Sequence, residues 1–402
     1  MKNIQKFKIF PLVCILFVNL SACNESKTQN LPQDVVIQTQ HNSQKVDEVH
    51  ESTPGDLNIS TTLSSGVEVI SGVNISNNVN IEQIAVYDAE IVKLDYELLK
   101  QLFLNNKEII EEASKEMAEA RTDALYHYCI TDDGSSLTYT GEGFTYEDGL
   151  YALMQNILFK NIIDLDQFVD NGDLSFLTRE EAQQEIEKVL NQLKLEVEET
   201  PICYTLAFDD LQLICDKLNS DRKTAVGEGS PLYTPLSCDE ADARYIFIYQ
   251  ISTKGLPIST HSNGVFGDGS WTSGTSLYCF YSAEGVVGME LPYSLKLTGQ
   301  APTTTNGLSI TQLLEKIDDK FNSMILSGSY LANKIEFEYV PMPVSGSRNL
   351  FKLIPGWRVS ILHTYQYQDP KSAGETFSAE EQFDVVFNAI TGEELVNSSG
   401  SA

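Results

Sequence analysis

The chain has 402 residues, enough for two or three small domains, and 42% of them are hydrophobic, so most of it can form packed cores. It carries 57 acidic and 27 basic residues, which gives a formal net charge of −30. This excess of acid excludes nucleic acid as the expected partner, because phosphates are bound by Lys and Arg. It also opposes adhesion to anionic lipid through basic residues.

The N-terminus has the pattern of an export signal. Residues 1–8 contain three lysines and no acid, residues 9–18 form an apolar run, and Leu20-Ser21-Ala22-Cys23 closes it. This order is typical of a secretory signal. The closing residues match the lipobox of bacterial lipoproteins, in which the signal is cut between Ala22 and Cys23 and the thiol receives a diacylglyceryl group.

Two alternatives are an ordinary cleaved signal and a single-span anchor, for which the apolar run is too short. We predict a signal peptide at residues 1–22 and a lipid anchor at Cys23 on the outer face of the bacterial cell membrane. Residues 23–64 are rich in Asn, Gln, Ser and Thr with few aromatics. Such a segment buries too little apolar surface to offset its ordering entropy, so it predicts a flexible tether.

Residues 65–163 are predicted to form an N-terminal α+β module. A strand is expected at 81–92, and apolar residues at helical spacing predict one long helix from the N-cap Asp95 to Ala120. Asp132-Asp133-Gly134 predicts the turn of a hairpin within 124–146. A second helix is expected at 150–163.

Two capping boxes mark helices further along the chain. The first runs from Thr178 to Glu181 and the second from Ser309 to Gln312, each followed by apolar residues on one helical face. Strands are expected after them at 195–207 and 335–339, the latter as a half-buried strand because apolar and acidic residues alternate.

Paired strands complete both predicted units, at 164–300 and at 301–402. In the first unit an apolar strand at 245–251 turns at Lys254-Gly255, and 277–281 pairs with 286–291. In the second unit 358–365 pairs with 381–390. A helix followed by an antiparallel meander, used twice, predicts an α+β fold with a helix on one face of each sheet.

These units resemble a known domain type. Thr-x-Glu-Glu-Ala opening a short helix is similar to the start of PepSY-like domains, and so are Pro355-Gly356-Trp357 before a strand and the final Phe-Asn-Ala-Ile-Thr-Gly-Glu at 387–393. The layout resembles a family of uncharacterised clostridial (Gram-positive) lipoproteins with PepSY-like C-terminal units. The resemblance covers about residues 164–396. It implies no established catalytic residues and a role in binding or inhibiting something outside the membrane.

The cysteines define no redox or metal motif. Five lie beyond Cys23, and none is in a C-x-x-C, which excludes a thioredoxin-like motif and a zinc ribbon. They are Cys129, Cys203, Cys215, Cys238 and Cys279. Export permits disulfides, and Cys203 and Cys215 are the nearest pair in sequence, but buried free thiols fit equally well. The pairing stays open.

No catalytic or metal constellation is visible. The histidines have no ligand partners at metal spacing, and the acidic run at 164–173 fits turns and helix capping better than a calcium loop. There is no G-x-S-x-G motif, and Cys129 near His127 lacks a third, orienting group. Paired carboxylates of a glycosidase type are not excluded in so acidic a chain. We therefore predict no catalytic residue, metal or cofactor.

A polar glycine-rich loop at 264–274 contains Gly267, Gly269 and Trp271. An exposed Trp in such a loop stacks on sugar or peptide, whereas the alternative is a hairpin tip with a partly buried Trp. Trp357 is predicted to be a core residue behind the last strand pair.

The expected function is that of a membrane-tethered, non-enzymatic binding or regulatory protein that contacts an envelope protein or protease. The alternative is a surface hydrolase acting on glycan or peptide, which requires a deep cleft that holds a carboxylate pair or a Cys–His pair with perturbed pKa values.

Overall fold

The computed structural model describes residues 58–76, 79–116, 125–148, 165–169, 172–226, 235–260, 274–299, 303–324, 326–344, 346–347, 349–368 and 376–395. All of these belong to one structural unit, Lys45–Ala402. The predicted signal with Cys23, the tether up to residue 57 and the predicted helix at 150–163 lie outside the described residues.

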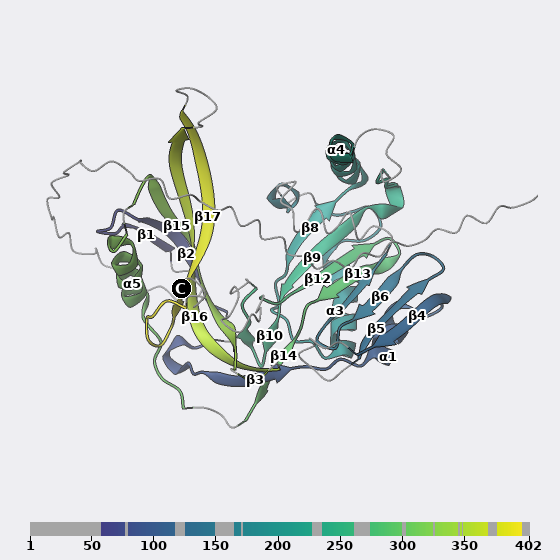
Figure 1. Cartoon of the computed structure of the whole chain (residues 1–402), viewed down its shortest axis with the longest axis horizontal. Coiled ribbons are helices and arrows are strands. Elements are labelled where there is room, and N and C mark those ends of the chain that lie inside the picture. The colour runs from purple at the N-terminus through teal and green to yellow at the C-terminus, as the bar shows by residue number, and fades with distance from the viewer. Residues whose placement is uncertain are drawn as a thin grey trace, which may run out of the picture. The chain divides into compact units, whose positions relative to one another are not determined.

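Two antiparallel sheets dominate the described chain (Figure 1). The first sheet has eight strands, in the order β4 (Ile109–Lys115), β5 (Tyr126–Thr131), β6 (Ser136–Tyr139), β7 (Phe144–Glu147), β13 (Gly285–Leu291), β12 (Ser276–Ser282), β9 (Arg244–Gln250) and β8 (Ile202–Leu206).

The second sheet has seven strands, in the order β1 (Asn58–Thr62), β2 (Glu68–Asn74), β15 (Ser329–Pro343), β16 (Leu350–Gln368), β3 (Tyr87–Ile91) and β14 (Leu295–Thr298), with β17 (Thr376–Asn388) also paired to β16. Only its β2–β15 pair is parallel among the described strands. Strands from residues 65–163 enter both sheets, and the predicted boundaries at 163 and 300 stay predictions.

Four α-helices lie in the described residues: α1 (Tyr96–Phe103), α3 (Arg179–Leu193), α4 (Phe208–Val226) and α5 (Ile310–Asn322). Three short 3₁₀ turns accompany them, η1 (Ile81–Gln83), η2 (Leu165–Phe168) and η3 (Glu240–Asp242), with a small hairpin of β10 (Ser252–Thr253) and β11 (Leu256–Pro257). Both predicted capping boxes are confirmed. The side chains of Thr178 and Ser309 each accept a hydrogen bond from the backbone N–H three residues on, and their own backbone N–H groups donate to the side chains of Glu181 and Gln312. The α+β prediction is confirmed: α3 precedes β8, β9, β12 and β13, and α5 precedes β15, β16 and β17.

The prediction of one long helix from Asp95 to Ala120 is wrong. Asp95 is the N-cap as predicted, but α1 ends at Phe103 and residues 109–115 form β4. Asn106 adopts a left-handed φ of 69°, which an α-helix does not tolerate, and the chain then pairs with β5 as an edge strand. The strand predicted at 81–92 is shorter, because η1 precedes β3.

The predicted hairpins are confirmed, and several strands are longer than predicted. β5 and β6 pair around Asp132-Asp133-Gly134, and β12 and β13 pair across residues 282–285. Lys254 and Gly255 both have positive φ between β10 and β11, which matches a tight hairpin turn. β15 and β16 extend well beyond the predicted 335–339 and 358–365.

Strand β16 changes partner along its length. It pairs with β15 from Phe351 to Thr364, while its other edge pairs with β3 up to Leu353 and with β17 from Gly356 onward. Pro355, which lacks an N–H, stands at this change of partner. The segment Pro355-Gly356-Trp357 therefore lies inside a strand, not before one.

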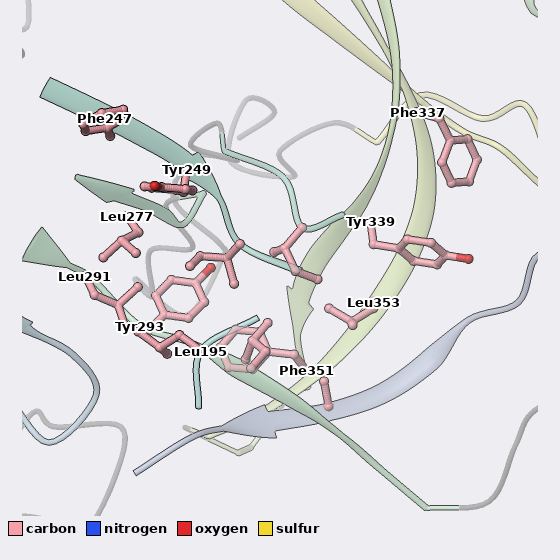
Figure 2. Packing of buried hydrophobic residues seen from close by; sticks show 14 of the residues in the cluster. Leu195, Phe247, Tyr249, Leu277, Leu291, Tyr293, Phe337, Tyr339, Phe351 and Leu353 are labelled. Atoms are coloured by element: carbon pink, nitrogen blue, oxygen red, sulfur yellow. The ribbon is translucent and has the colours of Figure 1, made fainter. Parts of the chain in front are cut away.

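One large cluster of buried hydrophobic residues includes members of both sheets. Figure 2 shows it running from Phe247 and Tyr249 through Tyr293 to Phe351 and Leu353. A second cluster lies on the other face of the first sheet, where α4 and η2 cover β8, β9 and β12. Alternate residues of β9 enter the two clusters, so both of its faces are buried. This matches the almost continuous apolar run predicted at 245–251.

The first sheet also holds a buried carboxyl group with a strongly shifted pKa. Glu147 of β7 lies between Ser136 and Gly288 of the neighbouring strands. Its Oε1 accepts a hydrogen bond from Ser136 Oγ at 2.9 Å, and its Oε2 is buried without a partner. Burial raises the pKa of Glu147 to about 7, and the nearby carboxylates of Glu290 and Asp148 add to the rise.

This shift makes stability depend on pH. An acid whose pKa is higher in the folded than in the unfolded chain stabilises the fold when protonated, and this stabilisation is lost as pH rises towards 7. We expect Glu147→Gln to unfold like the wild type near pH 4 but to be more stable by about 2 kcal/mol at pH 8. Urea denaturation at several pH values measures the difference, with the exposed-turn variant Glu284→Gln as control. If the free energy of unfolding changes with pH in the same way in the wild type and in Glu147→Gln, the raised pKa assigned to Glu147 is contradicted.

Candidate functional site

The candidate site is built on one face of the second sheet. Along β15, Phe337 and Tyr339 point into the core, where the Phe337 ring meets Trp357 edge-on at 5.2 Å between centroids. Because side chains alternate along a strand, Glu336 and Glu338 point to the opposite face. Glu338 is nevertheless only 1% exposed.

Arg358 of β16 joins these acids. It lies directly across from Glu336 and forms an ion pair with it, while its Nε donates to Glu338 Oε2 at 3.3 Å. Its Nη1 lies 3.6 Å from Asp384 Oδ2 on β17. Gly356 is the partner of Glu338 across the strands, and a side chain there would press against Val386 and Val340. The buried guanidinium of Arg358 thus forms ion pairs with three carboxylates.

The opposite wall comes from the segment between α3 and β8. Glu198 N donates to Gln250 O at 2.9 Å, which ties this segment to β9, and Ser76 Oγ donates to Glu198 Oε2 at 2.8 Å. The loop after β11 is fixed to β15, because Ser259 N donates to Tyr339 O at 2.9 Å. These bonds hold residues from distant parts of the sequence around one space.

That space is a cavity of about 370 Å³. Its ionisable lining residues are four acids and one base: Glu198, Glu199, Glu336, Glu338 and Arg358. Two of the lining residues, Glu338 and Glu198, each have one carboxylate oxygen, Oε1, that is buried and has no hydrogen-bond partner. A buried carboxylate oxygen without a donor is costly, so the cavity favours a ligand that supplies N–H or O–H donors.

The pKa values of both acids follow from this geometry. Burial raises the pKa of Glu338, although Arg358 and Ser259 oppose the rise. Burial also raises the pKa of Glu198, with the hydrogen bond from Ser76 opposing and Glu199 adding to the shift. A cationic group in the cavity would relieve both penalties, whereas an anion would add to them.

Sequence reasoning missed this site. The alternation of acids and apolar residues at 335–339 was a visible signal, but it predicted acids on an open face. The 257–259 loop bonds to Tyr339 next to Glu338, and Glu198 lines the same cavity, and neither approach is encoded locally.

The Cys129 and His127 pair of β5 lies on one strand face, as its spacing predicted. Tyr96 covers both: its ring stacks on His127 at 4.1 Å and its hydroxyl donates to Cys129 Sγ at 3.4 Å. Burial raises the pKa of the Cys129 thiol, and the residue is 0% exposed. The pair therefore has the features of core packing, since a reactive cysteine needs an accessible thiolate.

The other residues that the sequence singled out have structural roles or lie outside the described residues. Asp173 Oδ1 accepts from the backbone N–H of Arg179 at 2.9 Å, the turn and capping role expected for it. Among the described residues, no three His, Cys, Asp or Glu residues are placed to hold a metal ion. Gly267, Gly269 and Trp271 lie outside the described residues. Trp357 is fully buried, which confirms its prediction as a core residue.

The cysteine nearest in sequence to Cys215 is not its neighbour in space. Cys203 belongs to the large core cluster, whereas Cys215 belongs to the cluster beneath α4 on the other face of the first sheet. In this structure Cys129, Cys203, Cys215, Cys238 and Cys279 are all free thiols.

Within the described part of the chain, no helix has the length and apolarity needed to cross a membrane.

Comparisons with known proteins identify the fold alone. No protein-family model matches the chain. No curated protein matches it either. The structure is similar to the crystal structure of an uncharacterized protein from Eubacterium rectale ATCC 33656, with a TM-score of 0.63 and 15% identity over 84% of this chain and 92% of that one.

Proposed function

We propose that this chain is an extracytoplasmic lipoprotein, anchored through Cys23, that binds a cationic group of an envelope protein or protease without catalysing a reaction. The observation that carries the binding function is that Glu198 and Glu338, each with one buried carboxylate oxygen lacking a hydrogen-bond partner, line the same cavity. The N-terminal signal pattern and Cys23 support the location. The two capped helices, each followed by an antiparallel meander, support assignment of residues 164–300 and 301–402 as PepSY-like units.

The ligand chemistry follows from the charge and size of the site. Four carboxyl groups and one guanidinium leave the lining residues short of positive charge. The volume of about 370 Å³ lies at the small end of ligand pockets, which suits one side chain or a small amine. A primary ammonium group supplies three donors on a narrow stem, so a lysine side chain of the partner fits best.

A lysine peptide tests this proposal. We expect the full chain to bind the peptide acetyl-Gly-Lys-Gly-amide in calorimetric titration and to bind its Nε-acetylated form at least about tenfold more weakly, because a charge-assisted hydrogen bond contributes about 1.5–3 kcal/mol. Glu198→Gln should weaken binding of the free-amine peptide by a similar factor. Glu284→Gln, in an exposed turn, should leave it unchanged. Equal affinity for both peptides, or no affinity for either, would overturn the proposal.

The alternative of a surface hydrolase has its own support, because Glu198 and Glu338 both have raised pKa values and line one cavity. A carboxyl group with a raised pKa is suited to general acid catalysis. This alternative requires turnover of chromogenic glycosides or peptide substrates by the full chain, abolished in both Glu198→Gln and Glu338→Gln. Absence of turnover removes it.

A further inference from the structure

Two cysteines lie side by side on the face of the first sheet that α4 covers. Cys215 of α4 is 0% exposed, and Cys238, in the extended segment before η3, is half-buried against the same cluster. Both side chains pack in this one cluster, and each thiol affects the pKa of the other. The other three cysteines of the described chain belong to the large cluster on the opposite face.

A second contact fixes the register of this pair. Asn219, one helical turn after Cys215, donates from Nδ2 to Leu236 O and accepts from Leu236 N, both at 2.8 Å. Four residues of helix advance about 6 Å, and two residues of extended chain span about 6–7 Å. The Asn219–Leu236 contact, the packing of η3 against α4 and the shared cluster together place Cys238 within reach of Cys215.

We propose that Cys215 and Cys238 form a disulfide bond when the chain meets a disulfide-bearing oxidant outside the cytoplasm. Cys238 is the more exposed thiol, so its thiolate attacks the external disulfide, forms a mixed disulfide and releases one thiol of the oxidant. Cys215 then loses its proton, attacks the Cys238 sulfur and releases the second thiol. The two cysteines lose two protons and two electrons, and the external disulfide is reduced to two thiols.

The local electrostatics set the conditions for this step. Burial raises the pKa of Cys215 to about 12, and the aspartates nearby add to the rise. Thiolates are therefore scarce at neutral pH, and the reaction should accelerate with rising pH or with an oxidoreductase. The bond would link α4 to the start of β9 through η3 and close the loop 215–238, which constrains the unfolded chain.

Peptide mapping of the full chain tests the proposal. Trypsin places Cys238 in residues 224–244 and Cys215 in residues 195–217, and a further cut at Asp209 or Asp210 separates Cys215 from Cys203. After incubation with oxidised glutathione at pH 8, the unreduced digest should contain these two cysteine peptides joined, two hydrogens lighter than their sum. The thermal midpoint should rise by a few degrees and return on reduction.

Two variants make the result specific. Cys203→Ser should form the same linked peptide, and Cys238→Ser should form none while Cys215 remains a free thiol. The proposal is overturned if both thiols of the oxidised wild type are still alkylated after unfolding. It is also overturned if glutathione stays attached to Cys238 without ring closure, or if Cys215 links to a different cysteine.

Discussion

Replacing Arg358 by Met is expected to lower the free energy of unfolding by about 3–5 kcal/mol at pH 8, because it leaves a buried carboxylate without its counter-charge. Arg358 is 5% exposed and forms ion pairs with Glu336, Glu338 and Asp384. Methionine keeps much of the apolar length of the side chain. The loss of stability in this variant therefore measures mainly the effect of removing the positive charge. Urea denaturation followed by circular dichroism measures it.

The same variant should show a distinct pH dependence. Without the guanidinium, the already raised pKa of Glu338 rises further. A carboxyl group with a raised folded-state pKa loses its stabilising contribution as pH increases, so the defect should be smaller at pH 5 than at pH 8. Adding Glu338→Met should restore much of the loss. The control Lys352→Met, on the same strand as Arg358, removes an exposed ion pair with Asp88 of β3 and should cost less than about 1 kcal/mol. Equal losses in the two single variants would show that the buried pair has no special role.

The second large effect is expected at Trp357, one of the largest fully buried side chains. Trp357→Ala should destabilise the fold by about 3–5 kcal/mol, because it opens a cavity between β16 and the Phe337 ring. Trp357→Phe keeps most of the packing and removes an indole N–H that is buried without a hydrogen-bond partner. It should therefore cost less than about 1.5 kcal/mol.

Urea midpoints of both Trp357 variants, with Tyr367→Ala as the surface control, test this assignment. Tyr367 lies on the same strand but is 47% exposed, so its truncation should change stability by no more than about 0.5 kcal/mol. If Trp357→Phe proves as damaging as Trp357→Ala, the indole N–H has a role that the structure does not show.

Local signals in the sequence predicted the local structure well. The capping boxes at Thr178 and Ser309 specify their helix starts with residues three apart, and Asp132-Asp133-Gly134 specifies its own turn. The long helix after Asp95 failed because its apolar spacing continues past a left-handed residue, Asn106, into an edge strand. There the pairing with β5 outweighed helical periodicity.

Helix α4 could have been predicted but was not. Leu211, Ile214, Cys215 and Leu218 recur at helical spacing and are all buried. The candidate site differs in kind, because Glu198, Glu338 and Arg358 come from separate parts of the chain and only the tertiary fold brings them together. An acid at an alternating position does not reveal whether a distant loop covers it.

The parallel pairing of β2 with β15 affects the order in which the strands of the second sheet can assemble during folding. It aligns Val69 with Ala332 and Val73 with Ile335, so an N-terminal strand is completed only by residues near the other end of the chain. Strands β1 and β2 cannot find their sheet until β15 and β16 are available, and contacts of such long sequence separation form slowly. If the chain is exported from its N-terminus, β2 must wait outside the membrane with its β15 edge unpaired, and during this interval the protein is most open to aggregation or to a chaperone.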